Sequence, residues 1–306
     1  MISFIFRRFL ALLFVLFCVI SLTFFLMRLA PGGPFDRERK IPPAIEKKLL
    51  EKYKLDGPIQ QQYFDYLYDL AHGDLRLSTK YLNRTVNELL GQALPVSAVL
   101  GTAAFLIATA GGVWLGCLAA VRHRTGVDTA AMLSAMFAIS IPTFVVGPLL
   151  IFVFALKMPL FPVGGWGGLR SLILPAITLA GPYVAYIARL MRSSMLDVLG
   201  QDFIRTARAK GLSERTIIYK HALKVAILPV VSFLGPLAAN LLTGSIVVET
   251  IFNIPGAGGF FVNSIQNRDG FLLGGVVIVY CALLVVLNLA TDIAYTFLDR
   301  RIQLYD

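Results

Sequence analysis

The sequence predicts an all-α membrane protein with six transmembrane helices. Its 306 residues are 57% hydrophobic and have a mean hydropathy of +0.73, which is not the composition of a soluble domain. A helix of roughly 20 apolar residues crosses about 30 Å of hydrocarbon. Uncharged runs of about that length or more occur at 9–27, 89–121, 129–156, 171–188, 225–248 and 270–291.

The distribution of Lys and Arg predicts the orientation. If the amino terminus is cytoplasmic, every inner connection is basic. The basic residues of the short outer connections are then limited to Lys157, Arg170 and Arg268. Both termini are therefore expected in the cytoplasm. The long segment 29–94 lies outside this rule, which applies to connections of up to about 60 residues.

Three parts are expected along the chain. Residues 1–28 form a first transmembrane helix, which we interpret as retained because no small-x-small cleavage site precedes Arg28. Residues 29–94 form an outer helical segment, and residues 95–306 form a core of five helices. Cys18, Cys117 and Cys281 all lie in apolar runs and are expected to be packing residues.

Proline residues mark several expected helix boundaries. In the outer segment, one short helix is expected to open at Pro42-Pro43 and end near Leu55, and another to begin at Pro58. The second transmembrane helix is expected to begin near Pro95. In the third, Pro142 is expected to produce a kink, and the neighbouring hydroxyl groups of Ser140 and Thr143 either bond to the freed backbone or face a polar path.

The connection at about 189–224 is a basic insert between two apolar runs. Its second half, RTARAKGLSERTIIYKHALK, alternates Lys and Arg with apolar residues at loosely helical spacing, which indicates an amphipathic element at a membrane surface. Gly211 tolerates the left-handed conformation of a corner, and Ser213 is a suitable N-cap. We therefore predict two short helices that meet at Gly211. A basic loop that only sets the orientation is the alternative.

The fifth apolar run ends in polar residues, among them Asn240, Thr243 and Glu249. An ionisable residue near a span raises a functional hypothesis. The alternative for Glu249 is a position just outside the hydrocarbon, where it caps the following loop. That loop, VVETIFNIPGAGGFFVNSIQNRDG, contains a Pro-Gly pair, further glycines and three phenylalanines, Phe252, Phe260 and Phe261.

Motifs for catalysis are absent from the sequence. It contains no GxxxxGK[ST] phosphate loop, no GxSxG elbow and no HExxH, and its three histidines are widely spaced, at His72, His123 and His221. Any nucleotide hydrolysis is therefore expected on another polypeptide. We predict that this chain is not an enzyme and carries no cofactor.

Four stretches in order resemble the B-type inner-membrane permease subunit of oligopeptide and dipeptide ABC importers: MRLAPGGP, KYKLDG, RTARAKGL followed by HAL, and VVETIFNIPG. The basic insert is similar to the variant coupling motif of that family. Arg205 and Lys224 stand where the general motif has Glu and Pro, so the roles of those two positions do not carry over. Arg76 also departs from the small residue expected after Gly-Asp-Leu.

The resemblance implies a type I ABC importer permease fold in a bacterial inner membrane. It implies a homologous second permease, one or two ATPases that bind ATP and Mg, and an outer peptide-binding protein as partners. It assigns ATPase coupling to the insert, with Leu212 and Ile217 inserted into the ATPase. The expected coupling residues are Ala207, Lys210, Gly211, Leu212, Arg215, Ile217 and His221. The expected contacts of the outer loop with the binding protein are Glu249, Pro255, Gly256 and Phe260.

Other functions are also compatible with the sequence. Members of the same family also import nickel chelates, opines, sugars or antimicrobial peptides. A secondary transporter is a different class, but it predicts an inverted repeat and intramembrane acidic residues, and neither is evident. A structural membrane scaffold leaves the basic, Gly-broken insert unexplained.

Overall fold

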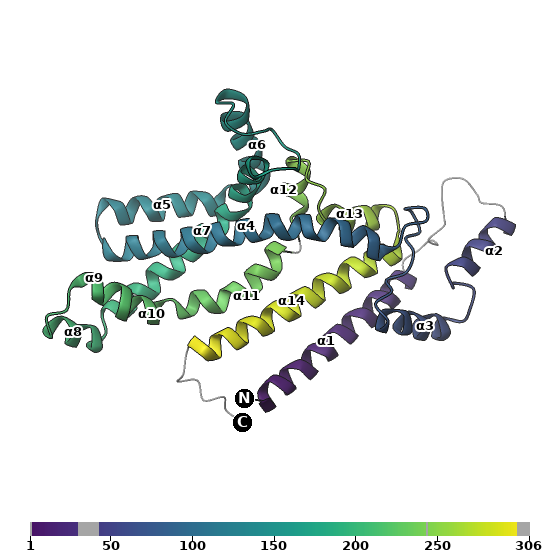
Figure 1. The fold of residues 1–306 in the computed structure, drawn as a ribbon, viewed down its shortest axis with the longest axis horizontal. Coiled ribbons are helices and arrows are strands. Elements are labelled where there is room, and N and C mark those ends of the chain that lie inside the picture. The colour runs from purple at the N-terminus through teal and green to yellow at the C-terminus, as the bar shows by residue number, and fades with distance from the viewer. Residues whose placement is uncertain (1, 30–42, 243, 299–306) are drawn as a thin grey trace. The chain divides into compact units, whose positions relative to one another are not determined.

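The computed structural model describes residues 2–29, 43–242 and 244–298, and these residues form helices and connecting turns (Figure 1). The all-α prediction is thereby confirmed. The helices are α1 (Ile2–Leu29), α2 (Pro43–Lys52), α3 (Ile59–Ala71), α4 (Val86–Val121), α5 (Gly126–Ser140), α6 (Thr143–Leu150), the π-helix η1 (Ile151–Lys157), α7 (Leu169–Leu199), α8 (Asp202–Ala209), α9 (Glu214–Thr216), the π-helix η2 (Ile217–Ala222), α10 (Leu223–Ala226), α11 (Leu228–Leu242), α12 (Ile246–Ile251), α13 (Gly258–Gln266) and α14 (Gly270–Leu298).

Five helical stretches of the described residues are long and apolar enough to cross a membrane, and a bent pair makes a sixth. The five stretches are Phe9–Leu29, Val86–Val121, Leu169–Leu199, Leu228–Ile251 and Gly270–Ala290. The bent pair joins Gly126–Ser140 to Thr143–Lys157 at an angle of 106°. The six predicted runs all have helical counterparts, but the third is not one straight helix.

Pro142 explains the bend. The residue before a proline is disfavoured in the α conformation, and proline itself donates no backbone hydrogen bond. Ile141 is accordingly extended, with φ −88° and ψ 121°, and α6 starts anew after Pro142. The Ser140 hydroxyl donates to the carbonyl of Met136 at 2.8 Å. The expected proline effect is present, but it breaks the helix rather than kinking it.

The predicted start of the second span near Pro95 is wrong. Helix α4 begins nine residues earlier, at Val86, and contains Pro95. Thr85 and Glu88 form a capping box: the Thr85 hydroxyl accepts from the Glu88 N–H at 3.1 Å, and the Glu88 carboxylate accepts from the Thr85 N–H at 3.3 Å. This local start signal outweighs the tendency of Pro to open a helix.

The chain packs as two compact units. Unit 1 contains Val96–Pro255 and the chain from Leu284 onward; unit 2 contains Ile2–Pro95 and Gly256–Leu283. These two units are defined by which residues pack against one another. The predicted division into residues 1–28, 29–94 and 95–306 describes positions relative to a membrane and stays a prediction.

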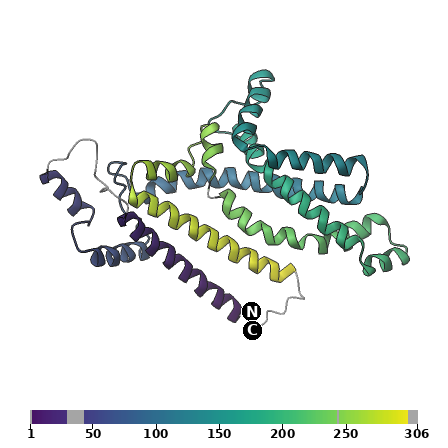
Figure 2. The same cartoon turned by 180° about the vertical axis from the view of Figure 1, so that it is seen from behind.

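Glycines bring the helices of unit 1 into close contact. A Cβ atom at Gly112 of α4 would lie 2.5 Å from the Ile187 Cβ of α7, and one at Gly116 would lie 2.4 Å from the Ala188 carbonyl oxygen. Small residues allow helix backbones to approach in this way. Helix α5 also packs against α7, and the two views show α4, α5 and α7 side by side (Figures 1 and 2).

The core of unit 2 is formed by aromatic and aliphatic side chains of α1, α3 and the first turns of α4 and α14. Both predicted outer helices are present, as α2 and α3. Tyr66 of α3 is 1% exposed, and burial raises the pKa of its hydroxyl to about 12 against the opposing effect of Arg76. Tyr66 therefore stays neutral.

Arg76 occupies an unusual backbone position in this unit. Its φ of 69° is left-handed, which is uncommon for a residue other than glycine. The side chain compensates with strong contacts: its Nε atom donates to the Asp69 carboxylate at 2.7 Å, and its guanidinium lies 5.5 Å from the ring centroids of Tyr66 and Phe271. The departure from a small residue is therefore accommodated by burial of the arginine.

Candidate functional site

The basic insert folds into a helical hairpin after α7. Helix α8 is amphipathic, because Ile204 and Ala207 are buried in the core of unit 1 while Phe203, Arg205 and Arg208 are exposed. The chain then turns and continues as α9, η2 and α10. The predicted pair of short helices is confirmed.

Gly211 and Ser213 form the corner of this hairpin. Gly211 has a φ of +76°, and its N–H donates to the carbonyl of Arg208 at 2.9 Å. The Ser213 hydroxyl accepts from the N–H of Thr216 at 3.4 Å, as an N-cap residue does. The predicted helix stop at Gly211 and start at Ser213 are therefore both confirmed.

An ion pair spans the corner. The Arg208 Nε atom donates to the Glu214 carboxylate at 2.8 Å, and this hydrogen bond lowers the pKa of Glu214. Both side chains are largely exposed, so the pair orients the corner more than it stabilises the fold.

The hairpin exposes an apolar and basic surface, which we call the coupling face. It consists of Phe203, Leu212 and Tyr219, exposed by 40%, 39% and 61%, together with the exposed side chains of Arg205, Lys210, Arg215 and Lys220. Arg215, Thr216, Tyr219 and Lys220 line a hollow of about 340 Å³. Exposed aromatic residues and arginine are enriched in surfaces that bind protein partners.

Two of the residues predicted for ATPase coupling, Ala207 and Ile217, are buried in the structure. Ile217 is fully buried and Ala207 is 7% exposed, so neither side chain is available for insertion into a partner. Both pack in the core of unit 1. Lys210, Gly211, Leu212 and Arg215 are exposed as expected, and His221 is partly buried. Phe203 and Tyr219 were not predicted, although Phe203 follows the apolar pattern next to buried Ile204 and Tyr219 next to partly buried Ile218.

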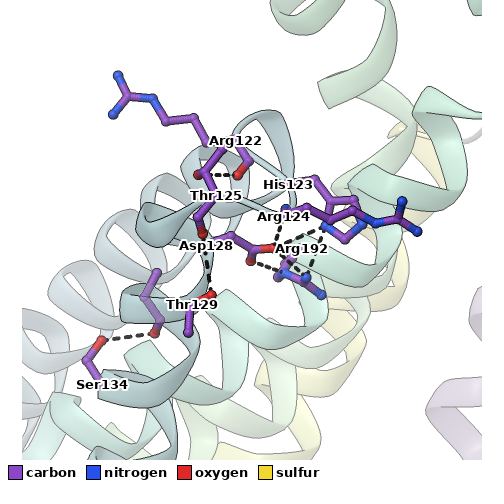
Figure 3. A network of polar contacts seen from close by, with 9 residues as sticks. Arg122, His123, Arg124, Thr125, Asp128, Thr129, Ser134 and Arg192 are labelled. Atoms are coloured by element: carbon purple, nitrogen blue, oxygen red, sulfur yellow. Dashed lines mark hydrogen bonds and ion pairs between the residues drawn. The ribbon is translucent and has the colours of Figure 1, made fainter.

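A polar network fixes α7 to the turn between α4 and α5 (Figure 3). The buried carboxylate of Asp128 accepts from Arg192 Nε at 2.6 Å and from Arg192 Nη2 at 2.8 Å. The N–H of Arg124 donates to the same carboxylate at 3.1 Å, and His123 Nδ1 lies 3.1 Å from it. Because α8 follows directly after α7, this network anchors the helix that carries the hairpin.

Glu249 lies in α12 in the interior of unit 1. Its side chain is buried, and the Ser97 hydroxyl of α4 donates to its Oε1 atom at 2.7 Å. The following connection runs through exposed Pro255 and partly buried Gly256 to Phe260. Phe260 packs edge-on against Tyr81, with centroids 5.7 Å apart. Of the four residues predicted to contact a binding protein, Pro255 alone is exposed.

Comparisons with known proteins match nearly the whole chain. The family model described as "Binding-protein-dependent transport system inner membrane component" matches residues 112–304, and its companion for the N-terminal part matches residues 1–83. The oligopeptide transport system permease protein OppB of Salmonella typhimurium is 48% identical over 305 residues, covering 99% of this chain and 100% of OppB. The dipeptide transport system permease protein DppB of Bacillus subtilis is 44% identical, with 98% and 97% covered.

A solved structure shares the fold. A chain of the MetNI methionine ABC transporter in an inward-facing conformation superposes with a TM-score of 0.59 at 16% sequence identity. The match covers 70% of this chain and 97% of that chain.

Proposed function

The chain belongs to the family of binding-protein-dependent transport system inner membrane components, and we propose that it is the permease subunit of an ATP-driven importer of oligopeptides or dipeptides. Membership in the family confirms the resemblance seen in the sequence, and the likeness to MetNI confirms the importer permease fold. The protein is a multi-pass inner-membrane protein.

The observation that carries the proposed substrate class is the full-length similarity to named peptide permeases. The matched regions, at 44–48% identity, cover 98–99% of the chain. Nickel chelates or antimicrobial peptides are the alternative cargo. A secondary transporter is disfavoured, since the insert has no role in that class.

In the proposed complex, this chain forms half of the translocation path and a homologous permease forms the other half. One or two separate ATPases bind ATP and Mg and face the hairpin in the cytoplasm, where both chain termini also lie. The peptide-binding protein approaches the α12–α13 connection on the other side. The absence of a phosphate loop from this sequence supports the assignment of hydrolysis to a partner.

The coupling face supplies the mechanical contact. Phe203, Leu212 and Tyr219 enter a groove of the ATPase, and the surrounding cations meet acidic groups at its rim. When two ATPases close on ATP, the docked hairpin moves with them. The Asp128–Arg192 network passes this movement to α4 and α5, because it ties α7 to the turn between them. The bundle then exchanges an inward-open path for an outward-open one.

Co-purification and ATPase assays test this proposal. The chain is purified with its partners, reconstituted in lipid, and assayed with and without peptide-loaded binding protein. We expect the loaded binding protein to stimulate hydrolysis severalfold and peptide to accumulate inside the vesicles. A folded chain with which no ATPase co-purifies would refute the coupling role, and stimulation by a nickel chelate but no peptide would refute the substrate class.

Tyr219 is the most exposed aromatic side chain of the coupling face, and Tyr219→Ala is expected to weaken ATPase binding about tenfold or more, the effect of a typical interface hot spot. Titration of the ATPase onto the reconstituted permease measures this affinity. Tyr68→Ala is the matched control, because Tyr68 is 66% exposed but belongs to α3 of unit 2 and is not part of the hairpin. Equal affinities in both variants would exclude Tyr219 from the interface.

A further inference from the structure

Unit 2 contains a cavity that the transport mechanism does not use. Its volume is about 620 Å³, within the range of about 300–1,000 Å³ that is usual for small-molecule sites. Thr23, Phe24 and Met27 of α1 form one wall, and Phe271, Leu273 and Val277 of α14 form another. The walls are therefore mainly apolar, as an acyl chain requires.

The polar groups at this cavity leave an excess of positive charge. Arg28 and Arg268 both line it, and neither forms an ion pair with any residue that the structure describes. Asp269 also lines it, but its carboxylate already accepts from the Ser78 hydroxyl and from three backbone N–H groups, those of Thr79, Lys80 and Leu272. An anionic ligand would therefore meet two arginines and one carboxylate, whose charge is stabilised by four hydrogen-bond donors, so a net positive charge remains.

Two side chains at or behind this cavity have buried polar atoms with no hydrogen-bond partner in the described part of the chain. The Thr79 side chain lines the cavity and is 5% exposed, and its hydroxyl has no hydrogen-bond partner among the described residues. Behind the wall, both terminal nitrogens of Arg76 are buried and likewise unbonded within the described part of the chain. The Arg76 guanidinium lies over the rings of Tyr66 and Phe271, which line the cavity. Buried polar groups of this kind ordinarily have partners.

The position of the cavity indicates where its ligand comes from. It lies at the C-terminal end of span Phe9–Leu29 and the N-terminal end of span Gly270–Ala290, and lipid headgroups lie at the ends of spans. Thr23 is about 7.5 Å deeper along α1 than Arg28, at 1.5 Å per residue. Leu26 and Ile265 at the rim are 55% and 51% exposed. An amphiphile in the bilayer can therefore enter with its chain among apolar side chains and its head beside the arginines.

We propose that this cavity binds an acyl chain of an anionic phospholipid, with the phosphate group held by Arg28 and Arg268. The bound lipid fills the space between α1, α13 and α14 and supplies an acceptor near the Thr79 hydroxyl. The site selects anionic over zwitterionic headgroups, because its uncompensated charges are cationic.

Photo-crosslinking of the complete transporter complex tests this site. The complex is reconstituted with phosphatidylglycerol that carries a diazirine at the end of one acyl chain, and the labelled peptides are mapped. We expect label on 23–28 and 270–277. The double variant R28Q/R268Q is expected to reduce this label about 25-fold, since one basic residue near an anionic headgroup strengthens binding about fivefold. Arg170→Gln is the matched control, an exposed arginine at the start of α7 that is not part of the cavity.

A second variant tests the apolar volume of the cavity separately from the charges of Arg28 and Arg268. Thr23→Phe fills the cavity but leaves both arginines, and it is expected to reduce labelling as strongly as the double variant. Equal labelling by diazirine phosphatidylcholine, or label unchanged in both variants, would overturn the proposal. So would displacement of the label by water-soluble glycerol phosphate, which lacks acyl chains. Absence of label in the assembled complex would show that another subunit covers the cavity and would also overturn it.

Discussion

Replacing Gly211 by proline is expected to abolish the stimulation of ATP hydrolysis by loaded binding protein while leaving membrane insertion intact. Gly211 has a φ of +76°, whereas proline fixes φ near −65°. Proline also removes the N–H that donates to the Arg208 carbonyl at 2.9 Å. The corner between α8 and α9 cannot form, so Phe203 and Tyr219 no longer belong to one face. Stimulated ATPase activity and peptide uptake in reconstituted vesicles measure the effect.

Two matched variants isolate the conformation of the corner. Gly211→Asn is expected to retain most of the coupling, because asparagine tolerates the left-handed region and a Cβ atom at this position meets nothing within 4 Å. Gly200→Ala should behave like the wild type, because Gly200 has a φ of −82° and its added Cβ makes only ordinary contacts. Normal coupling in Gly211→Pro would refute the role of the hairpin.

Breaking the pair between Asp128 and Arg192 is expected to cost about 2 kcal/mol, which is less than the roughly 3–5 kcal/mol for a fully buried ion pair that loses one partner, because Arg192 is 24% exposed. Asp128→Asn leaves the Arg192 guanidinium without its carboxylate, and Arg192→Met leaves the buried carboxylate without its cation. We expect both variants to unfold at lower temperature and to lose coupling, since α7 is released from the α4–α5 turn. Thermal unfolding of the purified complex measures the first effect and stimulated ATPase activity the second.

Controls for this pair come from the same chain. Asp202→Asn removes an exposed ion pair with Arg205 and is expected to leave the unfolding temperature unchanged. The double variant Asp128→Leu with Arg192→Met is expected to recover most of the stability without recovering the coupling, since two apolar side chains replace the pair. Wild-type stability in Asp128→Asn would show that the pair does not hold α7.

The features that the sequence predicts correctly in the hairpin depend on short-range interactions. Gly211 and Ser213 were predictable, because a left-handed turn and an N-cap act within four residues. The start of α4 is also decided locally, by the capping box of Thr85 and Glu88, which competes with the helix-opening tendency of Pro95. Thr or Ser followed three residues later by Glu is the sequence signal of such a start.

Helical periodicity predicts that Ile217 lies on an apolar stripe, but not what that stripe contacts. The sequence places it on an apolar stripe between basic residues, and such a stripe fits either a partner's groove or the protein's own core. In the structure Ile217 packs in the core of unit 1, whereas Phe203 and Tyr219 are exposed on the surface.

The sequence by itself determined the membrane class, the apolar runs that become spans, the short helices of the outer segment and the corner of the hairpin, because hydropathy, proline and glycine act over a few consecutive residues. Tertiary structure alone decided which side chains of the hairpin are exposed. It also decided that Asp128 meets Arg192 across 64 residues and that Arg28 and Arg268 line one cavity. These pairs depend on helices packing side by side, and no local pattern in the sequence encodes which faces meet.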